Sequence, residues 1–93
     1  MQEKHSIMIQ LFGLVQGVGM RYFIRNLANK LSIKGYVKNC DDGSVKCIAQ
    51  ANKDQLETFI NAIKTESPGR INHIKHEKSL ETTIFKTFDI TGE

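Results

Sequence analysis

Apolar residues alternate with other residues near the start of the chain, between Ile7 and Phe12. A two-residue period is typical of a β-strand, in which successive side chains point to opposite faces of a sheet. One face would carry Ile7, Ile9 and Leu11. The other face would include Met8 and Phe12, so both faces are partly apolar, and we expect this strand to lie in the interior of its sheet.

The apolar pattern changes its period after a glycine-rich stretch. From Met20 onwards, apolar residues recur at steps of three and four positions, which predicts an amphipathic helix. The apolar stripe of this helix would consist of Met20, Phe23, Ile24, Leu27, Ala28 and Leu31. Gly35 follows the helix, and we expect this glycine to permit the turn into the next strand.

A β-hairpin is predicted in the middle of the chain, with a two-residue turn at Asp42-Gly43. Its strands would span Ile33–Lys38 and Ser44–Gln50. This turn would place Cys40 opposite Val45, and Cys47 opposite Lys38. The two cysteines would then not face each other, so we expect no disulfide bond between them. We expect Cys47 to be a small buried residue rather than a reactive thiol.

A second helix is predicted after the hairpin. Asn52 and Gln55 have the spacing of a helix-capping pair. The apolar stripe that follows consists of Leu56, Phe59, Ile60 and Ile63. We expect the sequence Ser67-Pro68-Gly69 to end this helix, because proline and glycine are typical of helix C-terminal boundaries.

Two further strands are predicted in the last part of the chain. Arg70–Lys78 is expected to be a bulged strand, because its apolar residues Ile71 and Ile74 are three positions apart. After a loop over Ser79–Thr83, a last strand is expected over Ile84–Ile90.

The predicted order is therefore strand, helix, strand, strand, helix, strand, strand. This order indicates an α+β fold of the ferredoxin-like α/β sandwich type, β-α-β-β-α-β with an extra C-terminal edge strand. Two helices would cover one face of a mainly antiparallel sheet. We expect residues 1–93 to form a single domain, because a chain of 93 residues leaves no room for a second.

Composition narrows the partners and the location of the protein. The net charge of +3 is mild and the lysines are scattered, so charge does not favour a nucleic-acid partner. The sequence has no apolar run of membrane-spanning length, and residues 1–5 do not resemble a signal peptide. With two cysteines, the composition fits a reducing compartment. We therefore expect a cytoplasmic protein without membrane or nucleic-acid partners. We also expect it to be a monomer.

The glycine-rich stretch between Gly13 and Arg21 is the first candidate for chemistry. A glycine-rich turn that leads into a helix directs free N–H groups, and the positive end of the helix dipole, toward one place. Such a place binds anions, and phosphate is the usual ligand. Arg21 in the first helical turn is disfavoured by the helix dipole unless an anion lies beside it. The alternative from spacing alone is a tight turn followed by a solvated arginine.

Two segments resemble the motifs of the acylphosphatases, small enzymes that hydrolyse carboxyl-phosphate mixed anhydrides. The first is Gly13-x-Val15-Gln16-Gly17-Val18-x-Met20-Arg21. The second is Gly35-Tyr36-Val37-Lys38-Asn39, followed by Gly43-Ser44-Val45. Both occur in the order and spacing of the family, and the element pattern is similar from about Ile7 to Ile90. The sequence departs from the family at Ala51, where a glycine is usual, and in its C-terminal tail, which lacks a basic and aromatic ending.

The resemblance implies a role for each motif. The arginine of the first motif, here Arg21, would bind the substrate phosphate, and the asparagine of the second, here Asn39, would orient the attacking water. The loop N–H groups that would hold the phosphoryl oxygens belong to Gln16, Gly17, Val18, Gly19 and Met20. Judged without the resemblance, Asn39 would be an ordinary turn residue.

The expected substrate is a small-molecule acyl phosphate, and inorganic phosphate would be a product and a competitive inhibitor. We expect no cofactor and no metal site, because His73 and His76 would point to opposite faces of a strand. One alternative is a phosphate- or carbamoyl-phosphate-binding module without catalysis. An RNA-binding domain of the same topology would carry aromatic residues on its third strand, and the segment Val45–Ala49 has none.

Overall fold

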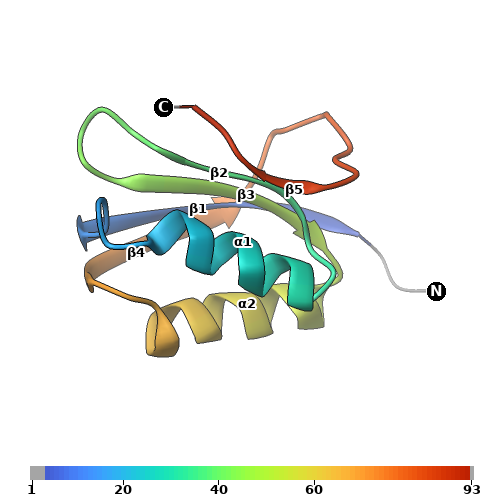
Figure 1. Cartoon of the computed structure of the whole chain (residues 1–93). Coiled ribbons are helices and arrows are strands. Elements are labelled where there is room, and N and C mark those ends of the chain that lie inside the picture. Colours follow the sequence, from blue (N-terminus) through green and yellow to red (C-terminus); the bar gives the residue numbers. More distant parts are fainter. Residues whose placement is uncertain (1–3, 93) are drawn as a thin grey trace.

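Two helices cover one face of a five-stranded sheet, which confirms the predicted ferredoxin-like fold (Figure 1). The structure is a computed structural model and describes residues 4–92. Its elements are β1 (His5–Leu14), α1 (Met20–Lys30), β2 (Lys34–Asn39), β3 (Val45–Ala51), α2 (Lys53–Glu66), β4 (Arg70–Lys78) and β5 (Phe88–Ile90). The strand order is β4-β1-β3-β2-β5. All neighbours are antiparallel except β2 and β5. β5 lies at one end of the strand order and is the expected extra edge strand.

The first strand lies in the interior of the sheet, as its two partly apolar faces predicted. β1 pairs with β3 on one side and with β4 on the other. Ile9 lies opposite Cys47 of β3 and His76 of β4. The bulge predicted in β4 is also confirmed: Phe12 pairs with His73 and Gly13 pairs with Ile71, so Asn72 is the extra residue.

The hydrophobic core fills the space between the helices and the sheet. Phe59 of α2 is fully buried and meets Phe88 of β5 edge-on, with 6.3 Å between ring centroids. Burying a side chain of this size stabilises the fold by about 1.5–3 kcal/mol. The buried helix residues are Met20, Ile24 and Ala28 of α1, and Leu56, Phe59 and Ile63 of α2. They belong to the two predicted stripes, so the periodicity located the core correctly.

The last strand is shorter than predicted, because the segment before Phe88 is held by a side chain. Gln50 of β3 donates from Nε2 to the Thr83 carbonyl oxygen at 2.7 Å, and its Oε1 accepts from the Phe85 N–H at 2.9 Å. These bonds occupy backbone groups that a longer strand would have used for pairing. Phe85 instead packs edge-on against Tyr36, at 5.6 Å between centroids. The predicted strand over Ile84–Ile90 is therefore wrong in its first four residues.

The turn out of the first helix is made by Ser32, two residues after α1 ends at Lys30, and not by Gly35 as expected. Ser32 has a φ of 60°, and the N–H of Ile33 donates to the Ala28 carbonyl at 2.8 Å. This bond and the left-handed residue form a Schellman motif. Gly35 lies inside β2, buried and with a φ of 146°. A glycine is required there because a Cβ atom would collide with the Ile48 carbonyl oxygen of the neighbouring strand.

Gly35→Ala is expected to lower the free energy of unfolding by roughly 3 kcal/mol, since the new methyl group must push two paired strands apart. Gly43→Ala is the matched control. Gly43 also has a positive φ, of 91°, but a Cβ there meets no atom within 4 Å. Its cost is that of the left-handed conformation, about 1 kcal/mol. Denaturant unfolding of both variants measures the difference, and equal losses would contradict the role of the Ile48 contact.

In the hairpin between β2 and β3, three residues (41–43) lie between the hydrogen-bonded Cys40 and Ser44, so the two-residue turn predicted at Asp42-Gly43 is wrong. The N–H of Cys40 donates to the Ser44 carbonyl at 2.8 Å, and the N–H of Gly43 donates to the Cys40 carbonyl at 3.1 Å. The register is shifted by one residue: Val45 lies opposite Asn39, and Cys47 lies opposite Val37. The cause is Gly43, whose positive φ permits a turn closed by one further residue.

Candidate active site

Three connections meet at one end of the sandwich (Figure 1). They are the glycine loop (residues 15–19) between β1 and α1, the hairpin loop (residues 40–44), and the turn between α2 and β4 (residues 67–69). Both predicted motifs lie here. The first supplies the glycine loop and Arg21, and the second supplies Asn39 at the end of β2.

The glycine loop is held at both ends and open in between. Val15 and Met20 are each 1% exposed and belong to the core, whereas Gly17 and Gly19 are exposed. Gly17 has a φ of 74° and Gly19 a φ of 85°, and neither Gln16 nor Val18 has a positive φ. A backbone in which φ alternates in sign is typical of nests, in which successive N–H groups bind an anion. The signs of φ along the loop are therefore compatible with an anion site, which stays a prediction.

The two helices differ at their N-termini. At α2, the Asn52 side chain accepts from the Gln55 N–H at 2.9 Å and Gln55 returns a bond of 2.9 Å, which confirms the predicted capping pair. At α1, no described side chain caps the helix, and the first turn has no acidic residue. Its N-cap is Gly19, and its second residue is the partly buried Arg21. The first turn of α1 therefore carries a cation and no acidic residue, which the helix dipole disfavours.

Asn39 lies on the side of the sheet that faces the helices. It pairs with Val45, and it shares a face with the buried Val37, two positions earlier. Its Oδ1 atom is buried and has no hydrogen-bond partner among the described residues. Leaving a buried oxygen unpaired costs about 1–3 kcal/mol, so such an atom calls for a ligand or a water. Asn39 Oδ1 is therefore an unpaired buried acceptor at the end of β2, among the described residues.

The Gln16 side chain joins the glycine loop to the hairpin. Its Nε2 atom donates to the carbonyl oxygen of Cys40 at 2.8 Å and to that of Ser44 at 2.9 Å. Cys40 directly follows Asn39, so the two motifs are connected through both hydrogens of one amide group. Sequence reasoning assigned Gln16 only a backbone role and missed this contact. The only sequence feature that could have indicated a side-chain role is that a polar residue, Gln16, lies between Val15 and Gly17.

A second polar cluster holds the hairpin loop to the sheet. Ser44, 1% exposed, donates from both its N–H and its hydroxyl to Asp42 Oδ1, at 2.9 and 2.6 Å. Its hydroxyl also accepts from Gln10 Nε2 of β1 at 2.9 Å. The hydrogen bonds from Ser44 stabilise the charged carboxylate and lower the pKa of Asp42 below its ordinary value. The sequence Asp-Asp-Gly indicated a turn, but it did not predict the hydrogen bonds of Ser44 with Asp42 and Gln10.

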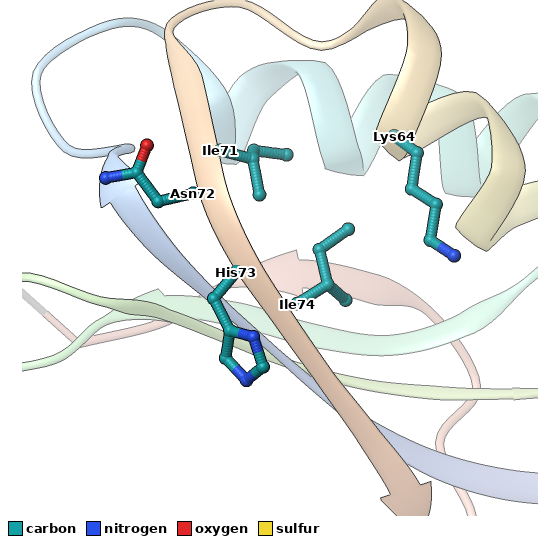
Figure 2. A pocket seen from close by; sticks show the side chains of 5 residues that line it. All are labelled: Lys64, Ile71, Asn72, His73 and Ile74. Atoms are coloured by element: carbon teal, nitrogen blue, oxygen red, sulfur yellow. The ribbon is translucent and has the colours of Figure 1, made fainter.

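The turn after α2 lies close to the end of β1 and to the glycine loop. A side chain at Gly69 would collide with the Leu14 carbonyl oxygen and with Val18. Beyond this turn, β4 borders a surface hollow of about 350 Å³, lined by Lys64, Ile71, Asn72, His73 and Ile74 (Figure 2). Figure 2 shows Asn72, the bulge residue, beside the end of β1. The lining includes no residue of the glycine loop, so this hollow is not part of the predicted site.

The cysteines and histidines have no catalytic arrangement. Cys40 and Cys47 are free thiols, as expected, and burial raises the pKa of Cys47 far above its ordinary value. His73 pairs with Phe12 and His76 pairs with Ile9, which places the two imidazoles on opposite faces of β4. Within residues 4–92, no group of three or more His, Cys, Asp or Glu side chains could hold a metal ion. No helix in this part of the chain is long and apolar enough to cross a membrane.

Comparison with known sequences gives one consistent result. The family model described as Acylphosphatase matches residues 7–90. An acylphosphatase from Staphylococcus haemolyticus is 44% identical over 88 residues, which cover 95% of this chain and 93% of the relative. One from Listeria monocytogenes is 45% identical over 89 residues, covering 94% and 96%.

Solved structures agree. The crystal structure of acylphosphatase from Bacillus subtilis has a TM-score of 0.89 and 34% identity, and the match covers 97% of this chain and all of that one. A structure of full-length HypF in a phosphate- and nucleotide-bound form has a TM-score of 0.88 and 30% identity. That match covers 99% of this chain but 12% of HypF.

Proposed function

The chain belongs to the acylphosphatase family and is an enzyme that hydrolyses acyl phosphates, and on this premise we propose that the glycine loop, Arg21 and Asn39 form its active site. The N–H groups of Gln16, Gly17, Val18, Gly19 and Met20 bind the phosphoryl oxygens. Arg21 adds a planar guanidinium group that donates to two oxygens at once. Together these donors hold the charge that spreads over the phosphoryl group in the transition state.

Asn39 orients the attacking water in this proposal. Its amide group both accepts and donates hydrogen bonds and does not titrate, so it can hold a water at any pH near neutrality. The water attacks phosphorus in line with the departing carboxylate, the P–O bond to the acyl group breaks, and the products are carboxylate and inorganic phosphate. One observation supports this role most: Asn39 Oδ1 is buried and has no partner among residues 4–92.

We further propose that the reaction needs no metal, because the loop amides and Arg21 already supply positive charge, and a carboxylate leaves readily. Charged residues on the exposed edge strand β4, including Arg70, Lys75 and Lys78, discourage pairing with a second sheet, which supports a monomer. The free thiols of Cys40 and Cys47 support a reducing, cytoplasmic location.

Inorganic phosphate is expected to inhibit competitively, because the product occupies the same loop as the phosphoryl group of the substrate. The measurement is phosphate inhibition of the hydrolysis of an aryl acyl phosphate at several substrate concentrations, with a chelator present throughout. Inhibition that persists as the substrate concentration rises would contradict a shared site.

The same assay tests metal independence, and the rate in chelator is expected to equal the rate without it. Activity that is lost in chelator and restored by a divalent ion would contradict the metal-free mechanism.

The same assay distinguishes the proposed enzyme from the alternative, a phosphate-binding module without catalysis. A module of that kind would bind phosphate but release none from the substrate above a blank. The curated relatives favour the enzyme, because this chain covers 93–96% of the length of the staphylococcal and listerial acylphosphatases.

A further inference from the structure

We propose that the Gln16 side chain is a positioning residue that fixes Asn39 relative to the phosphate held in the glycine loop. The proposal rests on the roles proposed above for the loop and Asn39, and it assigns the side chain a task separate from the backbone N–H of Gln16. Its basis is the pair of hydrogen bonds from Nε2 to the Cys40 and Ser44 carbonyl oxygens, at 2.8 and 2.9 Å.

The two acceptors belong to the point at which the hairpin closes. Cys40 and Ser44 face each other across it, and the Cys40 N–H also donates to the Ser44 carbonyl at 2.8 Å. The Cys40 peptide is attached directly to Asn39, so a shift of Cys40 is a shift of Asn39. Because both hydrogens of the Gln16 amide are used, the amide cannot rotate without losing a bond. The planar Gln16 amide therefore ties the glycine loop to the hairpin at two points.

The hairpin does not depend on Gln16 to form. Its strands pair along β2 and β3, Asp42 accepts twice from Ser44, and Gln10 of β1 donates to the Ser44 hydroxyl. Loss of the Gln16 amide should leave a folded hairpin that is free to move against the glycine loop. A displacement of about 1 Å between reacting groups can cost about 100-fold in rate. The expected defect is therefore in turnover more than in folding or phosphate affinity.

Gln16→Met tests this directly, because methionine has a similar length and no donor. We expect kcat for an aryl acyl phosphate to fall by roughly 10–100-fold, and KM and the phosphate inhibition constant to change less than about threefold. Gln10→Met is the matched control, since it removes a bond of the same kind, to the same serine, from a strand outside the loop. It should lower Tm by a similar amount and leave kcat near that of the wild type. Equal kcat in both variants would overturn the proposal.

Gln16→Glu adds a readout that a purely structural role would not move. An ionised glutamate faces two carbonyl oxygens without a hydrogen to donate, whereas a protonated glutamate donates one. The kcat of Gln16→Glu, divided by that of Gln16→Met at the same pH, should rise as pH falls through the range in which the glutamate protonates. A ratio that does not change with pH would count against the proposed contact.

A double-mutant cycle shows whether Gln16 acts through Asn39. If it does, Gln16→Met should have little further effect on kcat in an Asn39→Ala background, because the water is already unplaced. Equal losses in both backgrounds would overturn the proposal and leave the role of Asn39 intact. A near-normal Asn39→Ala enzyme would instead remove the proposed role of Asn39, and this inference with it.

Discussion

Arg21→Lys is expected to reduce kcat/KM by about 30- to 1000-fold, which corresponds to roughly 2–4 kcal/mol of transition-state stabilisation. Lysine keeps the positive charge but lacks the planar fork with which a guanidinium group grips two oxygens. If Arg21 binds the phosphoryl group in the ground state as well, KM and the phosphate inhibition constant should rise together. A part of the loss that is confined to the transition state should appear as a lower kcat.

Arg21→Met separates charge from packing. Methionine retains most of the apolar stem, so an arginine that only packs along α1 would be replaced without a kinetic effect. We expect this variant to be at least as defective as Arg21→Lys. Its Tm should scarcely fall and could rise, because a cation is removed from the positive end of a helix dipole.

The matched control is Arg25→Lys, one turn further along the same helix. Arg25 stacks over the Tyr22 ring at 5.1 Å from its centroid, and no motif includes it. This variant should keep the kinetics of the wild type. Full kinetics and melting curves for the three variants provide the measurement, and folded Arg21 variants with normal kcat/KM would end the case for Arg21 as the phosphate anchor.

Asn39→Ala is expected to lower kcat by about 100-fold or more while phosphate affinity stays close to that of the wild type. The reason is that the loop amides and Arg21 remain, whereas the water loses the group that orients it. Stability should change little, because Asn39 Oδ1 has no partner among the described residues and its removal leaves no other group unpaired.

Asn39→Asp and Asn26→Ala complete this experiment. Aspartate has the same shape but no N–H donor and adds a negative charge near the phosphate, so it should not restore activity. Asn26 is an exposed residue of α1, and its replacement should leave kcat unchanged. A folded Asn39→Ala enzyme with near-normal kcat would return Asn39 to an ordinary role at the end of β2.

The local patterns predicted most of the fold because each depends on residues that are near in sequence. The helical stripe that begins at Met20, the capping pair Asn52 and Gln55, and the interior position of β1 are confirmed. The placement of both motifs at one end of the sandwich follows from the same topology.

The length of the last strand and the role of the Gln16 side chain were not predicted, because they depend on contacts between distant residues. Gln50 prevents residues 84–87 from joining β5 through bonds that span more than thirty positions. The Gln16 contacts with Cys40 and Ser44 likewise span 24 and 28 positions. The hairpin register was wrong for a local reason, since Asp-Gly is compatible with both two- and three-residue loops. The periodicity of apolar residues therefore could not predict the start of the last strand, the Gln16 contacts or the hairpin register.

The position of β1 has a consequence for how quickly the protein folds. β1 precedes the other strands in the chain, yet its partners are β3 and β4, and its pairing with β4 joins Ile7 to Lys78. Contacts between residues so far apart carry a large loop-closure entropy, and folds rich in them take about milliseconds to seconds to form, not microseconds. On the ribosome, the apolar faces of β1 would stay exposed until residue 78 has emerged and β4 can pair with β1. During synthesis, β1 is therefore the segment that most needs protection from aggregation.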